Sequence, residues 1–162
     1  MLVSDQVIDN TLSGEAVKKI NVTLVMVGSA LMGKKIDKYN AWNQDVLKVL
    51  KSIEGDKRFI RLGYIPVIDL VNIYNLADLF VMPSFYEPFG VVFAEAMAHK
   101  LPCIGVNSCA MPEIIDNGET GFIVPPGNSK ALASRIIELF RDEKELQKFG
   151  EAGYRKYFNQ FT

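Results

Sequence analysis

Short apolar runs alternate with segments of helical spacing along most of this chain. Runs of β-branched residues bounded by glycine or proline predict buried strands, and apolar positions three and four residues apart predict helices. The predicted strands are residues 22–27, 59–65, 79–82, 103–106 and 122–124. The predicted helices are residues 37–53, 66–75 and 90–100, a helix from its cap Asn128 through Phe140, and residues 143–158.

Strands that are apolar on both faces and alternate with helices are typical of a parallel sheet covered on both sides. The pattern therefore predicts an α/β fold with a Rossmann-like sheet of about five strands. The 162 residues suffice for one domain, 1–162, and no linker or repeat divides them. Ligands of such folds bind beyond the carboxyl ends of the strands, which directs attention to the loops 28–35, 64–67, 83–90 and 107–113.

The helix predicted over residues 90–100 carries one carboxylate, Glu95, in an otherwise apolar run from Val91 to Ala98. Apolar side chains on every side of a helix predict that the whole helix is buried. A carboxylate in such a helix loses its hydration, which is unfavourable unless a partner binds it, so Glu95 is a candidate ligand-binding group. The alternative is a Glu95 side chain that reaches solvent.

A second carboxylate, Glu87, lies in the loop from Pro83 to Gly90 that leads from a strand into this helix. The first turn of a helix presents unpaired N–H groups at the positive end of its dipole, which suits phosphates and hydroxyl-rich groups. Gly90 allows the backbone to approach a ligand closely. Glu87 is then placed to accept hydrogen bonds from sugar hydroxyls, and Glu95 from a vicinal diol such as a ribose. The alternative for Glu87 is a hydrogen bond to its own loop.

The charge balance and the cysteines exclude several classes of protein. The net charge is −1 and no lysine or arginine run occurs, so we expect no nucleic-acid partner. No apolar stretch approaches the ~18 residues of a membrane span, and the first ten residues do not resemble a signal peptide. Cys103 and Cys109 form no CxxC motif or Cys/His cluster, which favours reduced thiols in a cytoplasmic protein. Because His99 is the only histidine, no His-rich metal site is expected.

A competing interpretation comes from residues 28–35, which read Gly-Ser-Ala-Leu-Met-Gly-Lys-Lys. They follow a strand and nearly match the phosphate-binding G-x-x-x-x-G-K-[ST] loop, so Gly28 to Lys34 would bind a nucleotide in a P-loop protein. Lys35 stands where that motif needs a Mg²⁺-binding hydroxyl, and no later strand ends in a convincing metal-binding aspartate. A further alternative is a module that binds nucleotide sugars without catalysis.

Several motifs follow Glu87 in a fixed order and at fitting distances. They are Glu87-Pro-Phe-Gly, Glu95-Ala-Met-Ala, Leu101-Pro102, Pro112-Glu-Ile-Ile and Asn117-Gly-Glu-Thr-Gly-Phe-Ile-Val-Pro-Pro. In this order they resemble the retaining group 1 glycosyltransferases of GT-B fold, which include sucrose and glycogen synthases. The resemblance covers roughly residues 22–162, as the C-terminal domain that binds the nucleotide sugar. It implies transfer of a hexosyl group from a nucleoside-diphosphate sugar to an acceptor hydroxyl, with retention of configuration and without a metal or other cofactor.

The resemblance also implies roles for individual residues. The first glutamate of the family's pair contacts the donor sugar and corresponds to Glu87, the expected catalytic residue. The second binds the ribose hydroxyls and corresponds to Glu95. Backbone N–H groups after the first glutamate hold sugar and diphosphate, a loop after the second full strand contacts the base, and a glycine-ended strand loop lies near the donor. The corresponding residues here are Phe89, Gly90, Val91 and Val92, then Tyr64 and Ile65, then Gly28.

The chain departs from the family pattern in three places. The family usually has glycine where this chain has Lys100, and two glycines where it has Cys109 and Ala110. An Arg- and Lys-bearing loop that neutralises the departing diphosphate is not found before Val22, and the N-terminal acceptor-binding domain is not found either. We therefore expect a fragment cut at both ends that binds the donor without turnover and whose missing partner is the acceptor domain.

Overall fold

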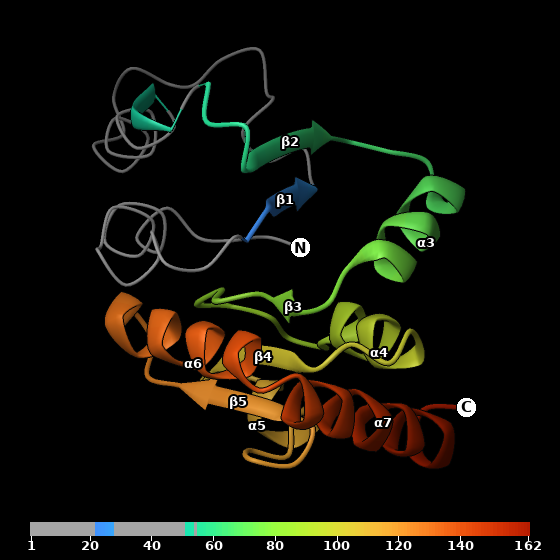
Figure 1. Ribbon diagram of the computed structural model, residues 1–162. Helices are drawn as coiled ribbons and strands as arrows, with labels where there is room; N and C mark the ends of the chain where they lie inside the picture. The colour runs from blue at the N-terminus through green and yellow to red at the C-terminus, as the bar shows by residue number, and fades with distance from the viewer. Residues whose placement is uncertain (1–21, 28–50, 54) are drawn as a thin grey trace.

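The structure is a computed structural model that describes residues 22–27, 51–53 and 55–162. Its strands are β1 (Leu24–Val27), β2 (Phe59–Gly63), β3 (Phe80–Val81), β4 (Cys103–Val106) and β5 (Gly121–Val124). Its helices are α3 (Val67–Leu76), α4 (Val91–Ala98), α5 (Met111–Ile114), α6 (Ser129–Arg141) and α7 (Glu143–Gln160) (Figure 1). Within the described residues, no helix combines the length and hydrophobicity that crossing a bilayer demands.

All strand pairs of the described residues are parallel, as the sequence predicts, but the strands form two sheets instead of one. β1 pairs with β2, and the second sheet has the order β3-β4-β5 (Figure 1). The prediction of an α/β fold with parallel strands is confirmed. The difference is that no pairing joins β1 to β3 within the described residues.

Most predicted elements appear with small shifts at their ends. The second predicted strand stops at Gly63, so Tyr64 and Ile65 belong to the connection that follows it. The side chain of Asn128 caps α6, as predicted, by accepting a hydrogen bond from the N–H of Ala131 at 2.9 Å. The loop 28–35 and most of the helix predicted over residues 37–53 lie outside the described residues, and so do Gly28 and Lys34.

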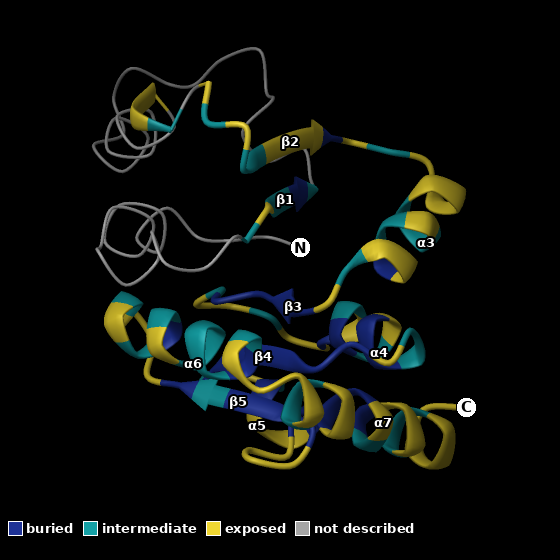
Figure 2. Cartoon of the chain, viewed as in Figure 1, coloured by how far each residue is buried: buried dark blue, intermediate teal, exposed yellow. Residues whose placement is uncertain are grey.

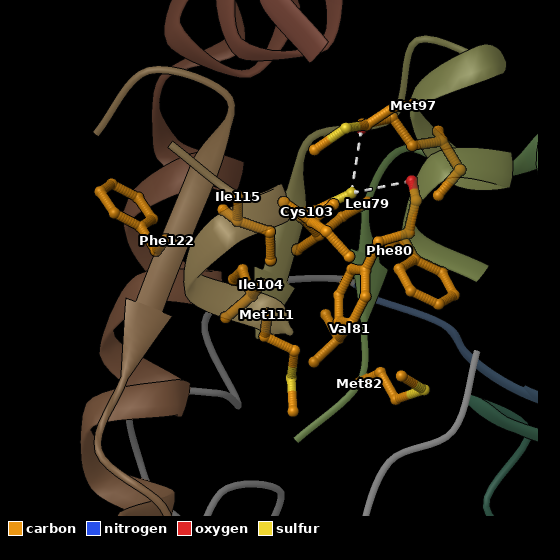
Figure 3. Close-up of a cluster of buried hydrophobic side chains, with 14 of the residues drawn as sticks. Leu79, Phe80, Val81, Met82, Met97, Cys103, Ile104, Met111, Ile115 and Phe122 are labelled. Atoms are coloured by element: carbon orange, nitrogen blue, oxygen red, sulfur yellow. Dashed lines mark hydrogen bonds between the residues drawn. The ribbon is translucent and has the colours of Figure 1, made fainter. Parts of the chain in front are cut away.

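The core is built around β4, whose four residues are all buried (Figure 2). Ile104 and Cys103 of β4 lie among side chains of β3, α4 and α5 (Figure 3). The Cys103 thiol is within hydrogen-bonding distance of two carbonyl oxygens, those of Leu101 at 3.5 Å and Phe93 at 3.9 Å. Burial raises the pKa of this thiol, so Cys103 is a neutral core residue.

One face of α4 contributes to this core and the other does not. Phe93, Ala96 and Met97 are buried, whereas Glu95 is exposed and Val91 is 59% exposed. The prediction that this helix is buried on all sides is therefore wrong. The helix lies against the sheet on one side, and its outer face carries alanine and valine, which an apolar pattern does not distinguish from core positions.

The last helix is fitted closely against the end of α4. A Cβ atom on Gly150 of α7 would overlap the carbonyl oxygen of Lys100. A Cβ atom on Gly153, one turn later, would meet the side chain of Met97, with its Cγ at 3.2 Å, and the carbonyl oxygen of Leu101 at an ordinary contact distance of 3.8 Å. The two glycines thus differ in what they allow, although both lie in the interior of one helix.

We expect Gly150→Ala to lower the free energy of unfolding by about 2 kcal/mol, because a rigid backbone oxygen must move to admit the methyl group. Gly153→Ala is the matched control. Its gain of about 1 kcal/mol in helix propensity offsets a small shift of Met97, so its stability stays within about 1 kcal/mol of the parent. Urea unfolding followed by circular dichroism measures both. Equal stability of the two variants would contradict this assignment of the α4–α7 contact.

Candidate functional site

The loops after β3 and β4 are joined to each other. Residues 82–90 follow β3 and residues 107–110 follow β4. The Ser108 hydroxyl donates a hydrogen bond to the carbonyl oxygen of Phe85 at 2.8 Å, and the N–H of Ala110 donates to the carbonyl oxygen of Glu87 at 3.4 Å. Because β3 and β4 are parallel neighbours, these loops begin at the same end of the sheet, where the carboxyl ends of the strands lie. The two hydrogen bonds fix the loop that carries Glu87.

Gly90 is the last residue of this loop and the N-cap of α4. Its backbone is left-handed, with φ of 62° and ψ of 22°, and a Cβ atom here would overlap the Cδ1 atom of Ile114. These two constraints explain the glycine without reference to a ligand. The N–H of Gly90 donates to Oε1 of Glu87 at 3.0 Å, which is the alternative that the sequence left open for this carboxylate.

The first turn of α4 has free donors. The N–H groups of Phe93 and Ala94 both bond to the carbonyl oxygen of Gly90, at 2.9 and 3.4 Å. For the N–H groups of Val91 and Val92, no acceptor is found among the described residues, and no side chain caps the helix. Two unpaired donors at the positive end of a helix favour an anion or a hydroxyl-rich group.

Glu95 lies about 40° from Val91 around the helix, one turn further along. The hydroxyl of Tyr74 on α3 donates a hydrogen bond to Oε2 of Glu95 at 3.1 Å. Burial of the Tyr74 ring, followed by the nearby negative charge and hydrogen bond of Glu95, raises the pKa of the phenol. The partner Oε1 has no hydrogen bond within the described part of the chain, so this carboxylate is only half satisfied by protein.

The predicted site residues are distributed unequally. Glu87, Phe89, Gly90, Val91, Val92 and Glu95 all lie within the loop before α4 and its first two turns. Phe89 is 80% exposed, and Tyr64 is 81% exposed in the connection between β2 and α3, next to Ile65. Within the described residues, no hydrogen bond or ring contact joins Tyr64 or Ile65 to the α4 group. Gly28 lies outside them.

Tyr74 was missed by sequence reasoning. It occupies an apolar position of a predicted helix, 21 residues before Glu95, and no motif spacing connects them. A signal was nevertheless available, because tyrosine is an amphipathic residue whose hydroxyl needs a partner when the ring is buried.

Residues 8–156 match the family of group 1 glycosyl transferases. The chain belongs to that family. It is 31% identical over 116 residues to the N-acetyl-alpha-D-glucosaminyl L-malate synthase of Bacillus anthracis, a match that covers 72% of this chain and 30% of that enzyme. The matched part of the chain spans less than a third of the length of this enzyme and of other curated relatives.

Solved structures give the same family fold. The UDP-glucose complex of Anabaena HepE has a TM-score of 0.73 and 25% identity, covering 86% of this chain and 37% of that one. The C-terminal domain of a group 1 family glycosyl transferase of Francisella tularensis has a TM-score of 0.68 and 24% identity, and covers 99% of this chain and 98% of that one. The fold is therefore that of the C-terminal half of a GT-B glycosyltransferase, as the sequence motifs implied.

Two non-glycine residues of this glycosyltransferase chain have left-handed backbone. Among the described residues, Lys100 has φ of 58° and Cys109 has φ of 50°, and every other residue with positive φ is glycine. Both are among the three positions, with Ala110, at which the sequence departs from glycine in the pattern that it resembles; Ala110 itself is right-handed, with φ of −74°. The left-handed region costs a residue with a Cβ atom about 1–2 kcal/mol, which is a physical reason for glycine at the first two positions.

We expect Cys109→Gly to raise the free energy of unfolding by about 1 kcal/mol, because it relieves the left-handed backbone strain at an exposed residue. Cys109→Ala is the matched control, since it removes the thiol and keeps the Cβ atom, and we expect it to leave stability nearly unchanged. Chemical denaturation under reducing conditions measures both. A Cys109→Ala variant as stable as Cys109→Gly would contradict the role of the backbone.

Proposed function

We propose that this chain is the donor-binding part of a longer retaining glycosyltransferase, a hexosyltransferase that uses a nucleoside-diphosphate sugar. The observation that carries the proposal is the first turn of α4, where two unpaired N–H groups lie between two carboxylates, Glu87 and Glu95. Unpaired donors suit the diphosphate and carboxylates suit hydroxyl groups, so the arrangement matches a ligand with phosphates between two sugars.

The proposed binding mode assigns each contact by its chemistry. The N–H groups of Val91 and Val92 bind diphosphate oxygens, and Glu95 accepts hydrogen bonds from the ribose. Glu87 keeps its bond to Gly90 through Oε1 and offers Oε2 to hydroxyls of the transferred sugar. Tyr64 and Ile65 contact the base, and Gly28 lies near the donor. This mode needs no metal ion or other cofactor, since helix donors supply the positive potential.

Transfer with retention needs the donor held while the diphosphate leaves and an acceptor hydroxyl attacks the anomeric carbon from the same face. The transition state is oxocarbenium-like, so positioning and charge stabilisation account for most of the catalysis. We propose that the acceptor and a cationic group for the departing diphosphate come from an N-terminal acceptor domain, and that the isolated chain binds donor without turnover. Both described cysteines are free thiols, which favours a cytoplasmic enzyme.

We expect UDP, GDP or ADP to bind the chain equally well with and without Mg²⁺, and Glu95→Ala to weaken the best of them about tenfold. The reason is the loss of charge-assisted hydrogen bonds to the ribose. Isothermal titration calorimetry measures the dissociation constants.

The same titrations separate the alternatives. Glu138→Ala is the matched control and should bind as the parent does, because Glu138 lies on α6 and pairs with Arg135 in the described part of the chain. Binding of triphosphates alone, strictly dependent on Mg²⁺ and abolished by Lys34→Ala, would replace the proposal with the P-loop interpretation. Detectable sugar transfer by the isolated chain would overturn the part of the proposal that denies it turnover.

We expect a thiol reagent to modify Cys109 and not Cys103 in the folded chain, and a bound nucleoside diphosphate to slow the reaction of Cys109. Cys103 is buried with a raised pKa, whereas Cys109 is exposed in the loop 107–110, which is hydrogen-bonded to the loop of Glu87. Mass spectrometry of timed samples measures both rates. A labelling rate at Cys109 that is unchanged by saturating nucleotide would contradict the proposed position of the ligand.

A further inference from the structure

We infer that Tyr74 is a positioning residue for the donor, because its hydroxyl holds the Glu95 carboxylate in the orientation that receives the two ribose hydroxyls. The inference rests on the proposed function, which gives Glu95 its ribose. It adds a residue from α3, outside the loop and helix that carry Glu87 and Glu95.

Glu95 needs a group to orient it. Its side chain is exposed, and no lysine or arginine pairs with it within the described residues. A glutamate in this situation samples several rotamers, and a ligand must stop that motion when it binds. The hydroxyl of Tyr74, at 3.1 Å from Oε2, is the one protein donor in the described part of the chain that limits this freedom.

Tyr74 is itself held rigidly. Its side chain is 6% exposed, and its ring lies against Phe80 of β3 with ring centroids 6.1 Å apart. The ring also stacks on that of His99, with centroids 5.3 Å apart and an interplanar angle of 16°, and Nδ1 of His99 lies 2.8 Å from Oδ1 of Asn75. The phenol is therefore fixed by the core and by the end of α4, and only its hydroxyl reaches the site.

The direction of this hydrogen bond matters for the ligand. Because burial raises the pKa of Tyr74, the phenol stays protonated at physiological pH and acts toward Glu95 as a donor. It occupies one acceptor position of Oε2 and leaves Oε1 and the remaining lone pairs for a diol. A carboxylate fixed in this way accepts two adjacent hydroxyls with less loss of side-chain freedom, which tightens binding.

The test is a double-mutant cycle on the 162-residue chain with Tyr74→Phe, Glu95→Ala and the double variant. Calorimetry compares UDP, GDP and ADP with their 2′-deoxy counterparts. We expect Tyr74→Phe to weaken the best ribonucleotide about fivefold and its 2′-deoxy form less than about twofold, so that discrimination for ribose falls. In the Glu95→Ala background the same change has no effect. Phenylalanine keeps the ring contacts, so we expect the melting temperature to change little.

Tyr154→Phe, which removes the hydroxyl of a tyrosine on α7, is the matched control and should bind as the parent does. An equal loss for ribose and 2′-deoxyribose ligands, or a loss that persists without Glu95, would show that Tyr74 supports the fold only and would overturn the inference. Unchanged affinity in Tyr74→Phe, beside a clear loss in Glu95→Ala, would overturn it and leave the proposed function intact. Unchanged affinity in Glu95→Ala would overturn both.

Discussion

The left-handed turn at Gly90 is the constraint on which the rest of the site depends. It connects the loop after β3 to the first turn of α4. Gly90 lies directly against Ile114, so the turn is packed on the core. The same residue gives its N–H to Glu87, so the carboxylate lies beside the free donors of Val91 and Val92. A side chain at this position would displace Ile114 and strain the backbone together, which would move both glutamates relative to the helix end.

Contacts between α5 and α7 support this turn. The Nζ atom of Lys156 on α7 donates to the carbonyl oxygen of Glu113 at 3.2 Å and lies 2.7 Å from Oδ1 of Asp116. The Lys156 side chain is 8% exposed and that of Asp116 is 48% exposed, so water shields the ammonium group little but still reaches the carboxylate. The ion pair fixes the end of α5 just after Ile114, and the last helix of the chain therefore helps to hold the first turn of α4.

Sequence reasoning succeeded where one local signal was sufficient. The apolar runs gave the parallel strands, a single polar residue gave the cap at Asn128, and the glycine before Val91 marked the start of α4. It failed where burial or contact depends on distant segments. The pattern of α4 could not show which apolar positions face the sheet, and the contact between Tyr74 and Glu95 joins residues 21 positions apart. Apolar runs also do not show which strands pair, so they could not predict that β1 and β3 are unpaired with each other.

The exposure of Glu95 changes the physical reason for its place in the site. A buried carboxylate would need the ligand as a partner in order to remain in the fold, so ligand and stability would be strongly coupled. An exposed one is hydrated in the free protein, and the cost of removing that water arises when the nucleotide binds. In the proposed binding mode, hydrogen bonds from the ribose must exceed the hydration that they replace, which is easier for a carboxylate already oriented by Tyr74. Under that proposal, discrimination for ribose depends on the orientation of the carboxylate as much as on its charge.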